Sequence, residues 1–402
     1  MPVAQIILAL LALGTLLSLA FWAVALRRIV LTRRLPTARA GYDEPAVPNE
    51  RVCVIVPAHN ESSKISKLLE SLIGQDHERV SFLIVLDRCT DDTLEIARRV
   101  LGDDNRFEIV EITECADGWA GKVNAVHTAV QRSPKALDAD LLLFCDADTW
   151  FEPGTVRAAA AFLRSRGLQL LSLVCTLTSD RWFERLVQPA AGMELFYQYP
   201  LERANAIGER RRGFANGQFL LFDAPSYREI GGHAAVHEEL LEDLAFARLM
   251  QHRKRPAGVA LADGVVRCRM YESWEQFTRG WKRIFTEAAK RKPTRLRSAS
   301  LRVLGVAVAM PLGSGVAVVV GAAFISTPLG VSTLALGLAS LVIQVFGWAS
   351  AYTTGGAPAR YAPLYPIGAV LVARILRRAA RELDDGTPTS WGGMQYGRPV
   401  RE

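Results

Sequence analysis

The sequence predicts an α/β domain that is anchored between membrane-spanning helices. Residues 4–26 and 303–351 of the 402-residue chain are almost free of charged side chains, whereas residues 27–302 have the mixed composition of a globular protein. From Arg51 onward, short runs rich in Val, Ile and Leu alternate with amphipathic helical patterns. This alternation is typical of a parallel sheet that is covered by helices on both faces.

The first apolar run, residues 4–26, is expected to be an uncleaved membrane anchor. At ~1.5 Å per residue it is about 34 Å long as a helix, enough to cross a hydrocarbon core. Its basic residues follow the apolar run, whereas those of a signal peptide precede it. The positive-inside rule therefore puts the N-terminus outside and residues 27–302 in the cytoplasm. The basic residues concerned are Arg27, Arg28, Arg33 and Arg34.

Strand-like and helix-like segments follow one another in regular order after the anchor. The strand-like runs are almost continuously apolar, as expected of strands buried on both faces. The segments between them carry apolar side chains at helical spacing. In chain order we expect a strand at 52–58, a helix near 62–73, a strand at 82–87, a helix near 91–101, a strand at 107–112, a helix near 122–132 and a strand that begins at 141.

A membrane hairpin is expected near the C-terminus. Its two helices are residues 303–325 and 329–351, and the chain turns at 326–328. The last apolar run, residues 361–376, is short, contains two prolines and is flanked by arginines. That pattern favours an interfacial or re-entrant helix over a third crossing in this part of the chain.

The net charge of +7 points to a membrane surface rather than to nucleic acid. Basic side chains gather beside the apolar runs, and no basic stripe with interleaved aromatic residues crosses the middle of the chain. The second basic group precedes the hairpin and consists of Lys290, Arg291, Lys292, Arg295 and Arg297. We therefore expect contact with anionic lipid headgroups and no nucleic-acid partner.

Six cysteines are present without a C-x-x-C pair or a tight framework. Several lie in apolar, strand-like runs, so we expect buried free thiols in a reducing compartment. They are Cys53, Cys89, Cys115, Cys145, Cys175 and Cys268.

Polar residues follow several of the expected strands. Ligands of open α/β sheets bind beyond the carboxyl ends of the strands, so the chemistry is expected at residues 57–61, at Asp87 and at residues 146–148. The chain has no G-x-G-x-x-G after the first strand and no G-x-x-x-x-G-K-[ST]. Their absence disfavours a dinucleotide dehydrogenase and a P-loop NTPase.

Asp146 and Asp148 form a D-x-D pair at the end of an apolar strand. Two carboxylates at this spacing present hard oxygen ligands to one Mg²⁺ or Mn²⁺, which in turn neutralises a diphosphate. The alternative is that they cap a helix or stabilise a turn. Their position after the fourth strand favours the metal site.

Taken together, the motifs of residues 51–290 resemble family 2 inverting glycosyltransferases of the GT-A (Rossmann-like) fold. The flanking apolar helices also resemble those of bacterial enzymes that glycosylate hopanoids, carotenoids or ceramide, and the closing TSWGGMQYG (389–397) resembles a W-x-G-x-x-Y tail in some of them. The matching motifs are VIVPAHNES (54–62), VLDRCTDDT (85–93), GWAGKVNAV (118–126), FCDADTWFEPG (144–154), ANGQFLLF (215–222) and EDLAFARLM (242–250).

The resemblance implies a site for a UDP-sugar donor. Pro57, Ala58 and Glu61 lie in the loop that holds uracil and ribose, and Asp87 matches the aspartate that accepts the uracil N–H. Lys122 matches a lysine beside the nucleotide, and Asp146 also faces the donor. The alternatives are a solvated Glu61 at a helix start and a surface Lys122.

The resemblance also implies that Asp243 is the catalytic base. Inversion at an anomeric carbon requires one carboxylate to take the proton of the acceptor hydroxyl. The alternative is a solvated acidic helix start, because Glu238, Glu239 and Glu242 lie close by in the sequence.

The acceptor and diphosphate region is expected to involve two further motifs. One is the Asn216-Gly217 pair, and the other is an altered Q-x-x-R-W motif in which Gly280 separates the last two residues. That alteration disfavours a processive polysaccharide synthase. The alternative for residues 269–297 is a basic amphipathic helix on the membrane. The altered motif consists of Gln276, Arg279 and Trp281.

These observations predict a membrane-bound hexosyltransferase that moves a single sugar from a UDP-sugar to a lipid acceptor with inversion. We expect it to be a multi-pass protein of the bacterial inner or plasma membrane with a cytoplasmic catalytic domain. A processive synthase and a catalytically inactive membrane scaffold are the alternatives. The expected divisions are an anchor (1–26), a basic linker (27–50), the GT-A domain (51–268), basic interfacial helices (269–302), a membrane hairpin (303–351) and a short apolar helix with a tail (352–402).

Overall fold

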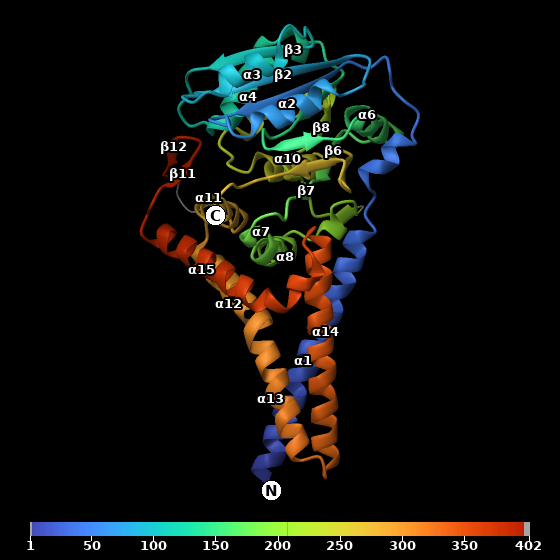
Figure 1. Ribbon diagram of the computed structural model, residues 1–402, viewed down its shortest axis with the longest axis vertical. Helices are drawn as coiled ribbons and strands as arrows, with labels where there is room; N and C mark the ends of the chain where they lie inside the picture. The colour runs from blue at the N-terminus through green and yellow to red at the C-terminus, as the bar shows by residue number, and fades with distance from the viewer. Residues whose placement is uncertain (1, 207, 398–402) are drawn as a thin grey trace.

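A seven-stranded sheet lies at the centre of the computed structural model, which describes residues 2–206 and 208–397 (Figure 1). The strands β1, β2, β3 and β4 are parallel and lie where the sequence predicts them. The strand order is β3 (Phe107–Ile112), β2 (Val80–Asp87), β1 (Val52–Ala58), β4 (Leu141–Phe144), β8 (Leu220–Asp223), β6 (Leu170–Val174) and β9 (Ala257–Leu261).

The predicted strands are parallel, but β8, which the sequence analysis did not predict, runs in the opposite direction. This strand pairs antiparallel with both β4 and β6, so the sheet is mixed. The reason lies in the path of the chain. Asn216 and Gly217 line the cavity just before β8 begins, so β8 runs away from the edge at which β4 ends.

Helices cover both faces of the sheet, as predicted. Along β1 the side chains of Val52, Val54 and Val56 pack into one buried cluster, and those of Cys53 and Ile55 pack into another. The alternation follows from the period of two in a strand. The first cluster includes α2 (Ile65–Ile73), α3 (Thr93–Leu101) and α6 (Thr155–Ser165), and the second includes α4 (Gly121–Arg132), α5 (Pro134–Leu137), α9 (Ala224–Glu229) and α10 (Glu242–His252).

A second layer lies between the large sheet and the membrane-facing end of the protein (Figure 1). Aromatic residues of this layer join Trp22 and Trp348 from the long helices in one buried cluster. The layer therefore attaches the sheet domain to those helices. It contains α7 (Trp182–Leu186), α8 (Gln188–Gln198), α11 (Trp274–Ala288), α12 (Pro293–Leu304) and α15 (Tyr365–Asp384). A small sheet of β5 (Thr149–Phe151), β10 (Val266–Cys268) and β7 (Thr176–Leu177) packs into the first cluster of the large sheet.

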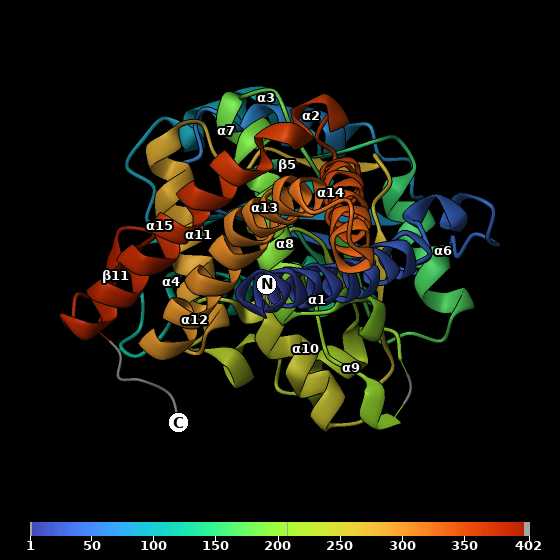
Figure 2. The same cartoon turned by 90° about the horizontal axis from the view of Figure 1, so that it is seen from below.

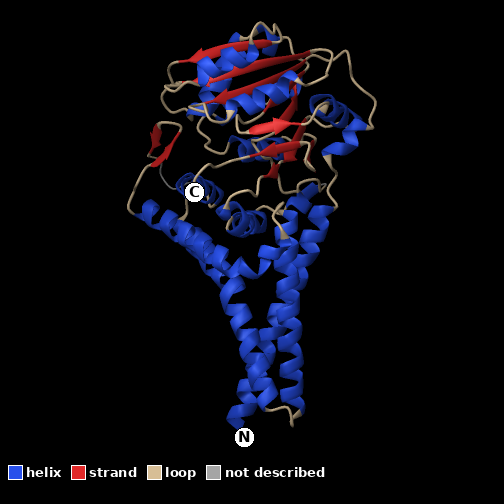
Figure 3. Ribbon diagram, viewed as in Figure 1, coloured by secondary structure: helices blue, strands red, loops and turns tan. Residues whose placement is uncertain are grey.

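Three helical segments in the described part of the chain are long and apolar enough to cross a membrane. They are α1 (Pro2–Arg33), the segment Pro293–Ala323 that ends in α13 (Met310–Ala323), and α14 (Pro328–Thr354). They form a stalk without strands below the sheet domain (Figure 3). One N-terminal anchor and a C-terminal hairpin are confirmed as apolar helices of sufficient length.

Polar side chains hold the three stalk helices together. Ser340 Oγ donates to Ser18 Oγ (2.9 Å), and the amide of Gln344 donates to Ser18 and to Ser314 Oγ (3.1 and 3.0 Å). All four residues are buried within the stalk. Such hydrogen bonds between helices stabilise packing where lipid supplies no alternative partner.

The short run at 361–376 starts against the stalk, where Tyr365 stacks on Trp348 of α14, and then leaves it. It forms most of α15, which extends sideways from the three spans and packs along α12 (Figures 1 and 2). Its buried side includes Val372 and Leu376, whereas Arg374 and Arg377 are exposed. This arrangement favours an interfacial helix over a further crossing in addition to those three.

The expectation that the basic group at 290–297 faces lipid headgroups is wrong for Arg291. Arg291 is buried, and its guanidinium lies 2.7 Å from Oε1 of Glu287 one helical turn earlier. Arg297 pairs with Asp384 of α15. Lys290 and Arg295 remain exposed.

The six cysteines are free, as predicted. Four of them are buried, and the remaining two, Cys89 and Cys115, are half-buried. Burial raises the pKa of the Cys53 thiol to about 12, so this side chain is a neutral core residue at physiological pH.

Candidate active site

A cavity of about 1080 Å³ opens at the carboxyl ends of β1, β2 and β4 and continues toward the stalk. It brings together every site residue predicted from the sequence. These are Pro57, Ala58, Glu61, Asp87, Lys122, Asp146, Asp148, Asn216, Gly217, Asp243, Gln276, Arg279 and Trp281.

The loop after β1 carries the first group of these residues. The backbone N–H of Glu61 donates to Thr93 Oγ1 (2.9 Å), which fixes the loop against the start of α3. Lys64 Nζ lies 3.5 Å from the Glu61 carboxylate. Burial raises the pKa of Glu61, and the charge of Lys64 partly opposes the rise. Glu61 is therefore a half-buried, paired carboxylate rather than a solvated one.

Asp87 ends β2 and is covered by the residue that follows it. Nε and Nη2 of Arg88 donate to the two carboxylate oxygens of Asp87, both at 2.7 Å. Arg88 adopts the left-handed conformation (φ 48°), which turns its side chain back onto Asp87. This bidentate pair fixes the plane of the Asp87 carboxylate.

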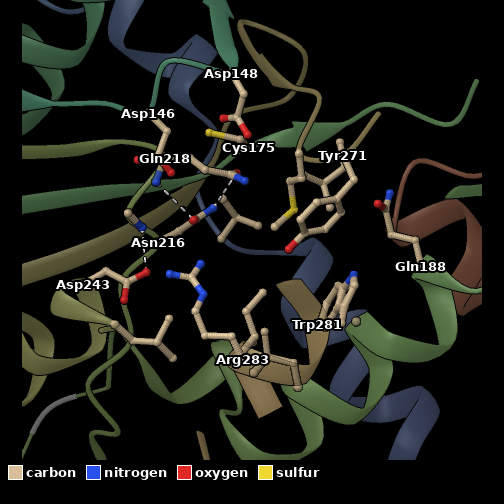
Figure 4. A pocket seen from close by; sticks show the side chains of 18 of the residues that line it. Asp146, Asp148, Cys175, Gln188, Asn216, Gln218, Asp243, Tyr271, Trp281 and Arg283 are labelled. Atoms are coloured by element: carbon tan, nitrogen blue, oxygen red, sulfur yellow. Dashed lines mark hydrogen bonds between the residues drawn. The ribbon is translucent and has the colours of Figure 1, made fainter. Parts of the chain in front are cut away.

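Asp146 and Asp148 follow β4 with their carboxylates at the cavity (Figure 4). Loss of hydration, reinforced by the negative charge of Asp146, raises the pKa of Asp148 to about 7. The Cys268 thiol lies 3.2 Å from Oδ1 of Asp148. Within the described residues no cluster of three or more His, Cys, Asp or Glu side chains has the arrangement of a metal site.

Lys122 joins the two acidic motifs of the site. Its Nζ lies 2.7 Å from Oδ1 of Asp146 and 2.5 Å from Oε1 of Glu242. These two carboxylates raise the pKa of Lys122 against the opposing effect of burial, and Lys122 in turn lowers that of Glu242. Lys122 is thus an ion-paired residue inside the cavity and not an isolated surface charge.

Asp243 lies in the first turn of α10 and points into the cavity (Figure 4). Its Oδ2 accepts from the N–H of Gly217 (2.8 Å), and its Oδ1 accepts from the N–H of Leu244 (2.7 Å). Loss of hydration and the neighbouring charge of Glu242 nevertheless raise its pKa to about 6. A carboxylate with this pKa is well suited to accept a proton near neutral pH.

The altered motif on α11 is divided between the cavity and the surface. Gln276 and Arg279 are exposed at the rim, whereas Trp281 is buried beside Tyr271. A Cβ added to Gly280 would overlap the ring of Tyr271. The inserted glycine therefore allows Tyr271 to pack against α11.

Several cavity residues were missed by the sequence analysis. Lys64 lies only three positions after Glu61, a spacing that could have indicated the pair. Tyr271 and Arg283 show no sequence signal, because their roles depend on packing between distant segments. Arg88 adjoins the cavity through Asp87, and its left-handed conformation has no sequence signal either. Arg283 points into the cavity, in the space between Asp243 and Trp281 (Figure 4).

A family model and a curated relative each match part of the chain. Residues 53–231 match the model described as glycosyl transferase family 2. The 4,4'-diaponeurosporenoate glycosyltransferase of Staphylococcus aureus is 26% identical over 267 residues, which are 64% of this chain and 67% of the relative.

Solved structures of similar shape have low sequence identity. A mannosyltransferase from Pyrobaculum calidifontis in complex with GDP-Man and Mn²⁺ is 17% identical, with a TM-score of 0.49 over 94% of this chain and 98% of that chain. Residues 1–349 of S. aureus TarS in complex with UDP-GlcNAc are 15% identical, with a TM-score of 0.40 over 88% of this chain and 97% of that chain.

Proposed function

Residues 53–231 form a glycosyl transferase family 2 domain, and from this premise we propose that the enzyme transfers a single sugar from a UDP-sugar to a membrane lipid with inversion. The observation that carries the proposal is the extent of the cavity. It runs from the strand-end carboxylates to apolar residues of the stalk helices, including Phe21 and Ala25 of α1 and Ala351 of α14.

The donor binds at the ends of β1 and β2 in this proposal. Ala58 and Glu61 contact the nucleoside from the first loop, and Asp87 accepts a hydrogen bond from the base. Arg88 holds the Asp87 carboxylate in one orientation, so this carboxylate is already positioned to bind the base of the nucleotide.

Asp146 and Asp148 would hold a divalent cation, Mg²⁺ or Mn²⁺. Asp148 is half-buried, and the ion pairs of Lys122 reach Asp146 rather than Asp148. Mg²⁺ is commonly bound by one or two carboxylates together with substrate phosphates, which fits a pair without a third protein ligand. When bound, the cation would stabilise the charge of the departing diphosphate.

Asp243 is the proposed general base. The N–H groups of Gly217 and Leu244 fix its carboxylate at the cavity wall. It would take the proton of the acceptor hydroxyl or carboxylic acid as the acceptor oxygen attacks the anomeric carbon and the bond from that carbon to the diphosphate breaks. Inversion follows if the attack comes from the face opposite the diphosphate.

Two buried polar groups support an acceptor site on the other side of the cavity. Tyr271 and Trp281 line the cavity, and their Oη and Nε1 atoms are buried without a hydrogen-bond partner within the described residues. A buried polar group without a partner costs free energy, which the polar end of an acceptor would offset. The S. aureus relative is named for its action on 4,4'-diaponeurosporenoate, and a hydrophobic acceptor with one polar end fits this cavity.

The proposal is tested by incubating the full-length protein in nanodiscs with UDP-sugars and a bacterial lipid extract. We expect UDP release that depends on the lipid, a product with one added sugar, and an inverted anomeric configuration by NMR. A product with many sugars would indicate the processive alternative. An absence of UDP release with every donor would indicate the inactive scaffold.

The proposed cytoplasmic orientation is tested separately in intact cells. Ser326 lies in the exposed turn between α13 and α14, and Ser298 is exposed on α12 at the other end of the span. A membrane-impermeant maleimide should label Ser326→Cys and leave the Ser298→Cys variant unlabelled. The reverse labelling would overturn the orientation.

A further inference from the structure

The C-terminal segment folds back onto the donor side of the cavity. After α15 the chain reaches up to the side of the sheet domain and forms a hairpin of β11 (Thr389–Trp391) and β12 (Met394–Tyr396) (Figure 1). Gly392 and Gly393 form its turn with φ values of 54° and 72°. Two consecutive residues with positive φ are typical of a tight two-residue hairpin.

Tyr396 contacts the start of α4. Its hydroxyl accepts a 2.9 Å hydrogen bond from the backbone N–H of Gly121, the first residue of that helix. The first N–H groups of a helix have no partner within the helix, so Tyr396 satisfies one of them. Lys122 follows directly, and its position depends on how this helix begins.

Gly392 contacts the residue that orients Asp87. Its carbonyl oxygen lies 3.3 Å from Nη2 of Arg88, the same nitrogen that donates to Asp87. Gly393 lies against His59, whose ring nitrogen is 2.6 Å from the carbonyl oxygen of Asp87. The turn of the hairpin is therefore packed around the end of β2.

Trp391 contacts the opposite side of the cavity. The guanidinium carbon of Arg283 lies 3.3 Å from the centre of the Trp391 ring, which is the geometry of a cation–π contact. Arg283 belongs to α11 and lines the cavity. The hairpin thus links the nucleotide side of the site to the helix that carries Trp281.

We infer that the hairpin β11–β12 is the outer wall of the donor pocket and that Tyr396, Gly392 and Trp391 are positioning residues for a nucleoside diphosphate. Tyr396 acts through the start of α4, Gly392 through Arg88, and Trp391 through Arg283. The inference rests on the proposed function, because it assigns the hairpin to the same donor site. A pocket wall that is formed before the ligand arrives lowers the ordering cost of binding.

The test measures UDP binding to the full-length protein in nanodiscs by calorimetry. Tyr396→Phe removes the acceptor of the Gly121 N–H and keeps the ring, and Trp391→Ala removes the stacked ring. We expect each to raise the Kd for UDP and the KM for the donor by roughly 3- to 30-fold, and Tyr396→Phe should leave the KM for the acceptor unchanged. Trp391→Phe should restore most of the affinity, because an aromatic ring remains beside Arg283.

Gln395→Ala is the matched control, since Gln395 is exposed on the same hairpin and should leave UDP binding unchanged. A chain that ends at Gly386 should show the largest loss. UDP affinity equal to that of the parent in both Tyr396→Phe and the shortened chain would overturn the inference.

Measuring nucleotide binding to the unmutated protein distinguishes a failure of this inference from a failure of the proposed function. If the parent does not bind UDP, the proposed donor is wrong, and the same variants are measured with GDP, CDP and ADP. A loss of affinity in Tyr396→Phe for whichever nucleotide binds would then support the hairpin as a pocket wall. Failure of all four nucleotides to bind the parent would overturn both proposals.

Discussion

The backbone N–H of Gly217 donates a 2.8 Å hydrogen bond to Oδ2 of Asp243. A Cβ at position 217 would lie 3.3 Å from that oxygen, which is closer than most side-chain contacts. Gly217 therefore lets the chain before β8 approach α10 closely. The contact holds the carboxylate at the wall of the cavity, beside Lys122 and Glu242.

Asp243→Asn should reduce transfer severely and leave UDP binding almost unchanged. The amide has nearly the same size but cannot accept the proton, so the loss falls on the chemical step. We expect turnover to drop on the order of 10² to 10⁴. The measurement compares turnover with the Kd for UDP in the same preparation.

Glu242→Gln is the matched comparison for that variant. Glu242 is buried and pairs with Lys122, so we expect its loss to appear mainly as a lower melting temperature. If Glu242→Gln abolished turnover with normal stability while Asp243→Asn remained active, the assignment of the base would move to Glu242.

The pH dependence of turnover should show one group that must lose its proton near pH 6. Loss of hydration and the charge of Glu242 raise the pKa of Asp243 to about 6, and only the ionised carboxylate acts as a base. Turnover should therefore fall as the pH drops below about 6 and level off above it. Saturating metal and donor are needed for the measurement, and a plateau that extends down to pH 4.5 would contradict the assignment.

Lys122→Met should destabilise the protein as well as reduce activity. It removes the cation shared by Asp146 and Glu242 and leaves Glu242 buried without its partner. Breaking a buried ion pair in this way typically costs about 3–5 kcal/mol. The melting temperature should fall clearly.

A double-mutant cycle checks the origin of that loss. Combining Lys122→Met with Glu242→Gln removes both charges, so the double variant should be less destabilised than the sum of the two single variants. Additive losses would show that the ion pair contributes nothing to stability.

The sequence was most informative about features that depend on residues close together in the chain. The strands β1, β2, β3 and β4 could be predicted from continuous apolar runs. The residues that follow these strands lie at the edge of the sheet where the strands end, so their position could be predicted as well. Asp87, Asp146 and Asp148 therefore reach one cavity, as expected. The direction of β8 could not be predicted in this way, because the side-chain pattern of a strand is the same in both directions.

Contacts between segments that are far apart in the sequence could not be predicted from it. Gly121 and Tyr396 are 275 positions apart, and no local pattern connects them. Arg291 pairs with Glu287, four positions before it, but α11 ends at Ala288 and both Lys290 and Arg291 have positive φ. The pair therefore depends on how the chain turns after the helix, which the helical spacing rule does not predict.

Removal of divalent metal should abolish activity if Asp146 and Asp148 hold a cation. Asp148→Asn keeps the size of the side chain and removes one charge, so turnover should fall on the order of 10² to 10⁴. Activity lost in EDTA should return with Mg²⁺ or Mn²⁺. Asp103→Asn is the control, because Asp103 is an exposed carboxylate in the turn after α3. Near-normal activity in EDTA would exclude the metal.

Replacing Lys290 and Arg295 by Gln should weaken transfer to a lipid acceptor more than hydrolysis of the UDP-sugar by water. Both side chains are exposed at the start of the helical segment that leads into the membrane, and each basic residue near an anionic surface contributes about 1 kcal/mol of attraction. Only the reaction with the lipid requires contact with that surface. The ratio of the two rates is measured in vesicles with and without anionic lipid, and the defect should disappear at high salt, because the attraction is screened. Arg291→Gln gives the necessary contrast: Arg291 is buried against Glu287, so this variant should lose stability and show no dependence on the charge of the lipid. If the exposed pair and Arg291 behaved alike in both vesicles, the basic segment would serve folding alone and not the approach of the acceptor.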